Sequence, residues 1–151
     1  MLFRSLRLYL HRMSWDAYIK QLKEAEDGSI QEAAICGIAP GQESVWASSP
    51  GLAGITAEEI KKLAGDRSGF RQCGPHVAGM KCMMLRDATE DKNTYSLDLK
   101  TTRGADGNAY SICVGKTNNA IVIAQGTKDA QGGQLAKHVF KMVTYLRDLN
   151  F

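Results

Sequence analysis

The chain has 151 residues and a formal net charge of +3, with 44% hydrophobic and 23% charged residues. This length and composition favour one globular domain with one hydrophobic core, and they exclude a largely disordered chain. No apolar run approaches the roughly 20 residues that a membrane-spanning helix needs.

The positive charge is concentrated in residues 1–12. This segment contains Arg4, Arg7 and Arg12 and no acidic residue, so the remaining chain carries 16 basic and 16 acidic residues. A neutral body argues against a nucleic-acid partner.

Two interpretations of residues 1–12 remain open. The apolar and basic residues separate onto two helical faces, as in segments for a membrane surface or organelle import. The alternatives are a mobile tail, or an upstream start codon with Met13 as the working start. We favour these alternatives because a helix of twelve residues is marginal in water. The predicted organisation is an extension at 1–12 and a domain at 13–151.

A short helix is predicted directly after this extension. Ser14 has the hydroxyl of an N-cap residue, and Asp16 lies in the first turn, where the helix dipole favours a negative charge. Trp15, Tyr18 and Leu22 recur on one helical face. These aromatic residues are either part of the core or part of a docking surface.

The next segments predict two strands and a second helix. Residues 31–38 and 44–49 have strand composition and flank a turn at Pro40-Gly41. A capping box that begins with Thr56, and a glycine at the other end, predict a short helix over 56–65.

After this helix the pattern indicates four more strands. Within them, alternation places Tyr95, Leu97 and Leu99 on one face of the sheet. Asn118 and Asn119 tolerate the left-handed conformation of a tight hairpin turn. Short connections imply antiparallel neighbours. The four segments are 77–87, 94–102, 109–116 and 120–126.

The last twenty residues predict a long helix with one apolar face, formed by Leu135, Val139, Met142, Val143 and Leu146. The order of elements therefore predicts an α+β domain: an antiparallel sheet with terminal helices that can cover one of its faces.

Motifs for catalysis are absent. The chain has no phosphate-binding glycine loop and no serine nucleophile elbow. Cys73, His76 and Cys82 fit no zinc module, and no cysteine pair has CxxC spacing, so we interpret the cysteines as reduced cytosolic thiols. These absences favour a binding protein over an enzyme and predict no metal and no cofactor.

Five motifs carry a resemblance to a known family: SWDAYI, SVWA, LAGDRSGF, MKCMMLRD and YLRDLNF. Their order and spacing resemble profilin, from about Met13 to Phe151. The resemblance implies a central antiparallel sheet with N- and C-terminal helices packed together on one face and a short helix elsewhere. It also implies a cytoplasmic, cytoskeletal protein that binds monomeric actin, proline-rich segments and acidic phosphoinositides, suppresses nucleation and supports barbed-end elongation.

For proline-rich segments, the resemblance implies a groove of aromatic side chains. Flat rings accept pyrrolidine rings, while Trp N–H and Tyr O–H groups donate to the exposed carbonyls of a polyproline II helix. Tyr145 stands where His is common in animal profilins, and Phe151 stands where Tyr is common. The alternative is that these aromatic residues only join the two helices. The matching positions are Trp15, Tyr18, Trp46, Tyr145, Leu146 and Phe151.

For actin, the resemblance implies a surface on the later strands and the last helix. Departures at Thr102, Gln131, Ala136 and Lys141 leave open an adaptor that binds proline-rich peptides with weak or lost actin affinity. The matching actin positions are Phe70, Lys81, Leu85, Arg86, Lys100, Gly133, Lys137 and Phe140.

Phosphoinositide binding rests on a cluster of basic residues, which attracts anionic headgroups. For Lys81, Arg86 and Lys100 the alternative is that they are solvated charges on strands. The cluster comprises Lys81, Arg86, Lys100, Arg103 and Arg147.

Overall fold

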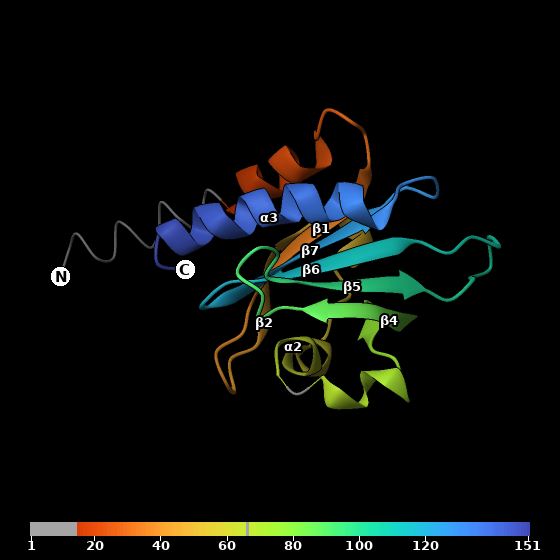
Figure 1. Cartoon of the computed structure of the whole chain (residues 1–151), viewed down its shortest axis with the longest axis horizontal. Helices are drawn as coiled ribbons and strands as arrows, with labels where there is room; N and C mark the ends of the chain where they lie inside the picture. Colours follow the sequence, from red (N-terminus) through yellow and green to blue (C-terminus); the bar gives the residue numbers. More distant parts are fainter. Residues whose placement is uncertain (1–14, 66) are drawn as a thin grey trace.

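The computed structural model describes residues 15–65 and 67–151, so Ser14 and the extension at 1–12 lie outside the described residues. Figure 1 shows a central sheet with the first helical segment, 15–23, beside α3 (Gly132–Asp148) on one face and α2 (Ala57–Ala64) on the other. The α+β class and the predicted placement of the helices are confirmed.

The sheet has seven strands in the order β2-β1-β7-β6-β5-β4-β3, and every neighbouring pair is antiparallel. Two short 3₁₀ helices, η1 (Pro50–Leu52) and η2 (Ser68–Arg71), flank α2. The strands are β1 (Ile30–Gly37), β2 (Ser44–Ser48), β3 (His76–Val77), β4 (Met80–Ala88), β5 (Ser96–Thr101), β6 (Ser111–Lys116) and β7 (Ala120–Gly126).

Two hydrophobic clusters lie on opposite faces of the sheet. The first joins the helical segment 15–23 and α3 to the sheet, and its members include Trp15, Ile19, Val139 and Leu146. The second lies under α2 and includes Ile60 of this helix together with aliphatic residues of the inner strands. Each fully buried aliphatic side chain contributes about 1.5–3 kcal/mol by leaving water. The apolar periodicity of the three helices therefore fixes the layer arrangement.

Glu59 connects α2 to the β3–β4 turn. The capping box is present: Thr56 accepts a hydrogen bond from the Glu59 backbone N–H, and the Glu59 carboxylate accepts one from the Thr56 N–H. The same carboxylate also accepts hydrogen bonds from the backbone N–H groups of Ala78 and Gly79, each at 3.0 Å. One side chain thus satisfies donors at the start of a helix and in a hairpin turn.

That turn corrects one predicted strand. Residues 77–87 are not one strand, because the chain reverses at Ala78 (φ 50°) and Gly79 (φ 80°) and separates β3 from β4. Positive φ at two successive residues is the signature of a tight hairpin. Ala78 is an uncommon residue at such a position, which is why the pattern did not predict the turn.

One further prediction in the later strands is wrong. Tyr95 does not share a face with Leu97 and Leu99: it has φ 50°, precedes β5, and packs against the first cluster, while both leucines belong to the second. The predicted hairpin near Asn118 and Asn119 is confirmed, although neither residue has a positive φ and the turn is closed by hydrogen bonds between Thr117 and Ala120. The backbone conformation at the start of β5 therefore determines the face on which Tyr95 lies, which the alternation of apolar residues alone does not predict.

No helix in the described part of the chain is long and apolar enough to cross a membrane.

Candidate functional site

Five aromatic rings from four parts of the chain meet beside the C-terminal end of α3. We call this cluster the aromatic groove. The Trp15 ring lies 5.0 Å from Trp46 and meets the edges of Tyr18 (5.5 Å) and Phe151 (5.4 Å), measured between ring centroids. The Tyr18 ring in turn meets Tyr145 of α3 at 5.7 Å and an interplanar angle of 77°. Residues far apart in sequence thus form one continuous aromatic surface.

Two rings of this surface are partly exposed. Trp46 is 37% exposed and Tyr145 is 49% exposed. The Tyr18 and Tyr145 hydroxyl oxygens are 3.5 Å apart. In this contact the Tyr18 hydroxyl donates to the Tyr145 hydroxyl, and partial burial together with the contact raises the pKa of Tyr18 to about 12.

Two predicted groove residues lie beneath the surface rather than on it. Leu146 has no exposed area, and Trp15 is only 4% exposed. Helical spacing places Leu146 on the buried face of α3 next to Val143, which also has no exposed area. These two residues therefore form the floor beneath the more exposed rings of Tyr18, Trp46, Tyr145 and Phe151.

Gly37 is a residue of this site that the sequence motifs did not identify. It is the last residue of β1, and the Trp46 indole lies directly against its backbone. A Cβ atom at Gly37 would come 2.5 Å from the indole Nε1, well inside contact distance. The absence of a side chain thus allows the Trp46 indole to lie against the backbone of β1 while its ring contacts Trp15 at an interplanar angle of 38°. In the sequence, the position of Gly37 at the end of a predicted strand was the one indication that another group approaches its backbone closely.

The C-terminal residue is held in place by its backbone. The Phe151 N–H donates to the Leu146 carbonyl at 2.9 Å, and its carbonyl accepts from the Asn119 N–H in the β6–β7 turn. The ring meets the edge of Trp15. Phe151 therefore contributes a ring but no hydroxyl to the groove, as its residue type implies.

A hollow lies beside the aromatic groove, between the segment 15–23 and α3. Its volume is about 760 Å³, and Tyr18 and Tyr145 line both regions. At the far end His138 Nε2 lies 3.0 Å from Asp27 Oδ2. Hydrogen bonds from Ser29, and then the contact with His138, lower the pKa of Asp27 from 3.8 to about 2. This contact joins the loop after the helical segment 15–23 to α3.

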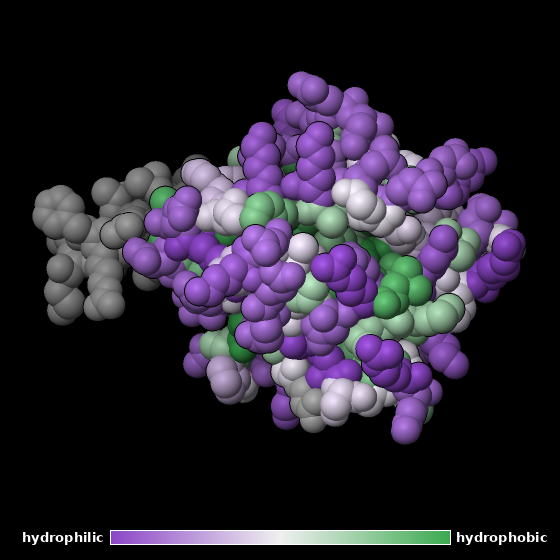
Figure 2. All heavy atoms as spheres, in the orientation of Figure 1, coloured by the Kyte–Doolittle hydropathy of each residue, from purple (hydrophilic) through white to green (hydrophobic). Residues whose placement is uncertain are grey.

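A separate exposed surface lies on β4 and β5. We call it the strand face: Lys81, Met83, Leu85, Arg86 and Lys100. Met83 is the cross-strand partner of Lys100, and Arg86 is the partner of Asp98. Because α3 packs mainly on β5, β6 and β7, β4 lies outside its main contact with the sheet (Figure 1). Green apolar atoms are visible below α3 among hydrophilic residues in Figure 2.

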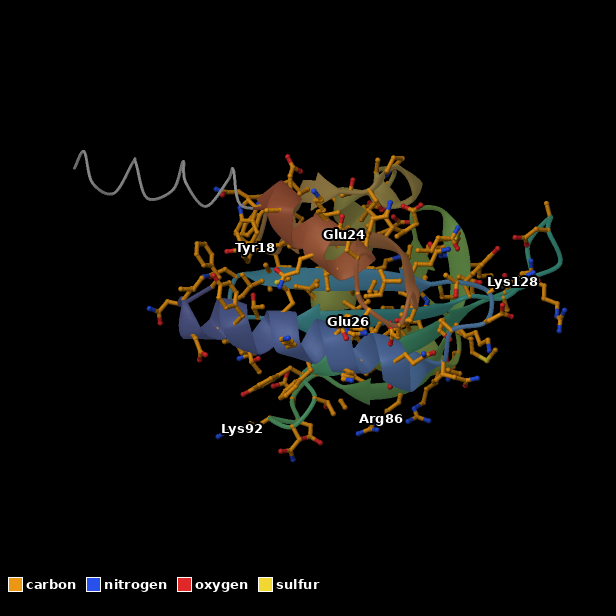
Figure 3. The ribbon with its side chains drawn as sticks, turned by 90° about the horizontal axis from the view of Figure 1, so that it is seen from above. Tyr18, Glu24, Glu26, Arg86, Lys92 and Lys128 are labelled. Atoms are coloured by element: carbon orange, nitrogen blue, oxygen red, sulfur yellow. The ribbon has the colours of Figure 1, made fainter. Side chains whose placement is uncertain are left out.

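The strand face and the aromatic groove lie on opposite sides of α3. Seen from above, Tyr18 lies on one side of this helix and Arg86 on the other (Figure 3). Within the described residues, Lys81, Arg86 and Lys100 form no ion pair within 4.0 Å. These charges are therefore available to a partner that leaves the aromatic groove free.

Asp98 lies beside Arg86 with a partly buried carboxylate. Burial raises the pKa of Asp98, and the positive charge of Arg86 opposes this shift. One carboxylate oxygen of Asp98 is buried and has no hydrogen-bond partner among the residues that the structure describes. An acceptor left unpaired in this way costs about 1–3 kcal/mol.

The structure separates the remaining predicted actin positions into three groups. Leu85 belongs to the strand face and is 57% exposed. Gly133 and Lys137 are exposed on α3, and Phe140 is half-buried. Phe70 is only 7% exposed and packs in the second cluster, so apolar contact from its ring is limited to a small edge.

The predicted phosphoinositide residues do not form one cluster. Lys81, Arg86 and Lys100 lie on neighbouring strands, and Arg103 follows β5 and donates to the Gly107 carbonyl. Arg147 lies elsewhere: its guanidinium donates twice to the Lys116 carbonyl, at 2.6 and 3.1 Å, and its Cζ atom lies 3.6 Å from the Tyr95 ring centroid. Arg147 therefore anchors α3 to the β6 end, which corrects its inclusion with the others.

Within the described residues, no group of three His, Cys, Asp or Glu side chains could hold a metal ion. Cys36, Cys82 and Cys113 are buried, and burial raises the pKa of each to about 12. Cys73 is exposed. The three buried thiols are therefore protonated and unreactive at neutral pH.

Comparison with known proteins identifies the family. The profilin family model matches residues 13–151. The chain belongs to the profilin family. It is 35% identical to human Profilin-1 over 136 residues, which cover 88% of this chain and 95% of that protein. It is 38% identical to bovine Profilin-3 over 136 residues, with the same coverage of both chains.

A solved profilin structure has the same arrangement. Mouse profilin IIa, in complex with a double repeat from the FH1 domain of mDia1, superposes with a TM-score of 0.83 at 33% identity, covering 91% of this chain and 99% of that chain. Profilins are proteins without enzymatic activity, and this chain is one of them.

Proposed function

We propose that this profilin joins monomeric actin on its strand face to proline-rich segments in its aromatic groove, and so regulates actin polymerisation. The observation that carries the proposal is the meeting of five rings beside the C-terminal end of α3, with the strand face on the other side of that helix. Two sites on one small body raise the effective concentration of actin near a proline-rich assembly factor. The expected consequences are suppressed nucleation, continued elongation at barbed ends, and a cytoplasmic location with the actin cytoskeleton.

The chemistry of the groove supports a proline-rich ligand. A polyproline II segment is already extended and has free carbonyls. Exposed rings of Trp46 and Tyr145 accept its pyrrolidine rings, while their N–H and O–H groups donate to those carbonyls. The related mouse profilin IIa, which is solved with an FH1 repeat, adds support from the family.

The strand face supports an acidic protein partner. Lys81, Arg86 and Lys100, which form no ion pair within 4.0 Å in the described part of the chain, lie around the exposed apolar side chains of Met83 and Leu85. Apolar contacts in the centre with charges at the rim are the anatomy of a protein interface. In this proposal the partner is monomeric actin, and Gly133, Lys137 and Phe140 extend the surface onto α3.

A second candidate function is a proline-peptide adaptor with weak or lost actin affinity. Lys141 favours it, because this exposed lysine stands where the family commonly has an acid. A charge of the wrong sign at an interface costs several kcal/mol. Phosphoinositide binding remains a proposal for Lys81, Arg86, Lys100 and Arg103 only.

One titration tests the proline site directly. Both tryptophans of the chain lie in the aromatic groove, so intrinsic tryptophan fluorescence reports its occupancy. A decaproline peptide should change this fluorescence with saturation, and a glycine-serine peptide of equal length should not. An unchanged signal at millimolar decaproline would contradict the proline site.

Actin is tested separately by its spontaneous nucleation. At saturating concentration the protein should lengthen the nucleation lag of purified actin. A normal lag at that concentration would exclude actin regulation, and decaproline binding with a normal lag would establish the adaptor instead.

A further inference from the structure

Met83 stands apart from the other methionines that the structure describes. It is 55% exposed, whereas Met142 is 6% exposed and belongs to the first cluster. Met80 and Met84 are partly buried and pack against the second cluster. Alternation along β4 explains the difference, because residues 80, 82 and 84 point to one face of the sheet and 83 to the other.

The surroundings of Met83 mark it as part of a contact surface. Lys100 is its cross-strand partner, Lys81 lies two residues before it, and exposed Leu85 lies two residues after it. A large apolar side chain placed among cations contributes to binding only while it remains apolar. Methionine adapts its shape to a partner, but its thioether is open to oxidation.

We infer that Met83 is an oxidation site through which peroxides weaken the binding of actin to the strand face. This inference rests on the proposed function. The thioether sulfur attacks one oxygen of hydrogen peroxide, an S–O bond forms and the O–O bond breaks. The second oxygen leaves as water after proton transfer. Sulfur is oxidised by two electrons, and the peroxide is reduced.

The product explains the loss of affinity. The sulfoxide is polar and carries a strong acceptor, and its burial against a partner without a matching donor is costly. Met80 and Met84 are partly buried and Met142 is buried, so Met83 should oxidise first and the fold should survive an exposure that oxidises it. The expected loss of actin affinity is about tenfold, equivalent to about 1.4 kcal/mol. Methionine sulfoxide reductases reverse this step.

The experiment uses the full chain with Cys73→Ser, since Cys73 is the exposed thiol that would also react. The protein is treated with hydrogen peroxide, and peptide mass spectrometry follows each methionine separately. Actin affinity is then measured by fluorescence anisotropy, and decaproline affinity by tryptophan fluorescence.

Two variants separate Met83 from the rest of the chain. Met83→Leu conserves volume and removes the thioether, so it should keep its actin affinity after peroxide. Met84→Leu is the matched control on the opposite face and should remain sensitive. We expect Met83 to oxidise before Met80, Met84 and Met142, with decaproline affinity unchanged and actin affinity restored by methionine sulfoxide reductase.

Three results would overturn the inference. The first is full actin affinity of a sample in which Met83 is completely oxidised. The second is an equal loss of affinity in peroxide-treated Met83→Leu. The third is oxidation of Met83 no faster than that of the packed methionines. If untreated protein does not bind actin, the proposed function itself fails, and the inference fails with it.

Discussion

Tyr145→Ala separates binding at the aromatic groove from stability of the fold. The Tyr145 ring is 49% exposed and contacts Tyr18 edge-on, so its removal costs only about 1–2 kcal/mol of folding free energy. As an aromatic anchor of an interface it contributes about 2 kcal/mol or more, which corresponds to a roughly thirtyfold loss of affinity for a proline-rich peptide.

Trp15→Ala would not make this separation. Trp15 is 4% exposed and contacts three other rings, so its truncation costs about 3–5 kcal/mol of stability. This is a large part of the stability of a small domain. Lost binding in that variant would report unfolding as much as lost contact.

The assay for Tyr145→Ala is isothermal titration with decaproline, combined with urea unfolding of the same sample. Tyr110→Ala is the matched control, because Tyr110 is a half-buried tyrosine just before β6 whose hydroxyl bonds to Asp106. A folded Tyr145→Ala protein with a decaproline Kd within twofold of the unmodified protein would refute the assigned role of this ring.

Three further changes test other parts of the structure. Gly37→Ala should displace the adjacent indole and weaken decaproline binding about fivefold in the same titration, about 1 kcal/mol; unchanged affinity would show that the indole position is immaterial. Arg86→Ala should weaken actin binding about tenfold in an anisotropy assay and leave decaproline binding intact; a parallel loss of both would contradict separate sites. Hydrogen bonds from Ser29 and His138 to the Asp27 carboxylate lower the pKa of Asp27 from 3.8 to about 2. They therefore stabilise the fold above pH 3.8, and this contribution is lost as the pH falls through about 2. Urea unfolding from pH 6 to pH 2 should therefore show a steeper acid loss for the unmodified protein than for Asp27→Asn, and equal slopes would contradict the linkage.

Strong local patterns predicted most of the fold. Helical periodicity identified the buried face of α3, and the Thr56–Glu59 pair identified the start of α2, because both signals depend on neighbours within one turn of helix. The turn at Pro40-Gly41 was equally readable: Gly41 has φ 78°, which glycine adopts without strain.

Features that depend on tertiary contacts were not predicted. The hairpin at Ala78 is supported from a distance by the carboxylate of Glu59, a contact that no local pattern contains. Tyr95 leaves the alternation of its strand because its ring lies under Arg147 of α3. In both places a residue far along the chain decides the local conformation.

The same reason limits prediction of the candidate site. Family motifs indicated which aromatic residues to consider, but their burial depends on packing between the helical segment 15–23 and α3. Trp15 and Leu146 therefore proved to be floor residues, and Gly37 was missed. Met83 was missed because imperfect alternation along β4 did not indicate which face is exposed.

Sedimentation velocity of monomeric actin with this protein and a labelled proline-rich peptide tests the central claim, that one chain holds both partners at separate sites. At micromolar concentrations we predict a single boundary that carries actin, the protein and the peptide label together. If the peptide label leaves the boundary whenever actin is bound, the two sites are not independent. If the protein does not sediment with actin even at tens of micromolar, the strand face is not an actin-binding surface.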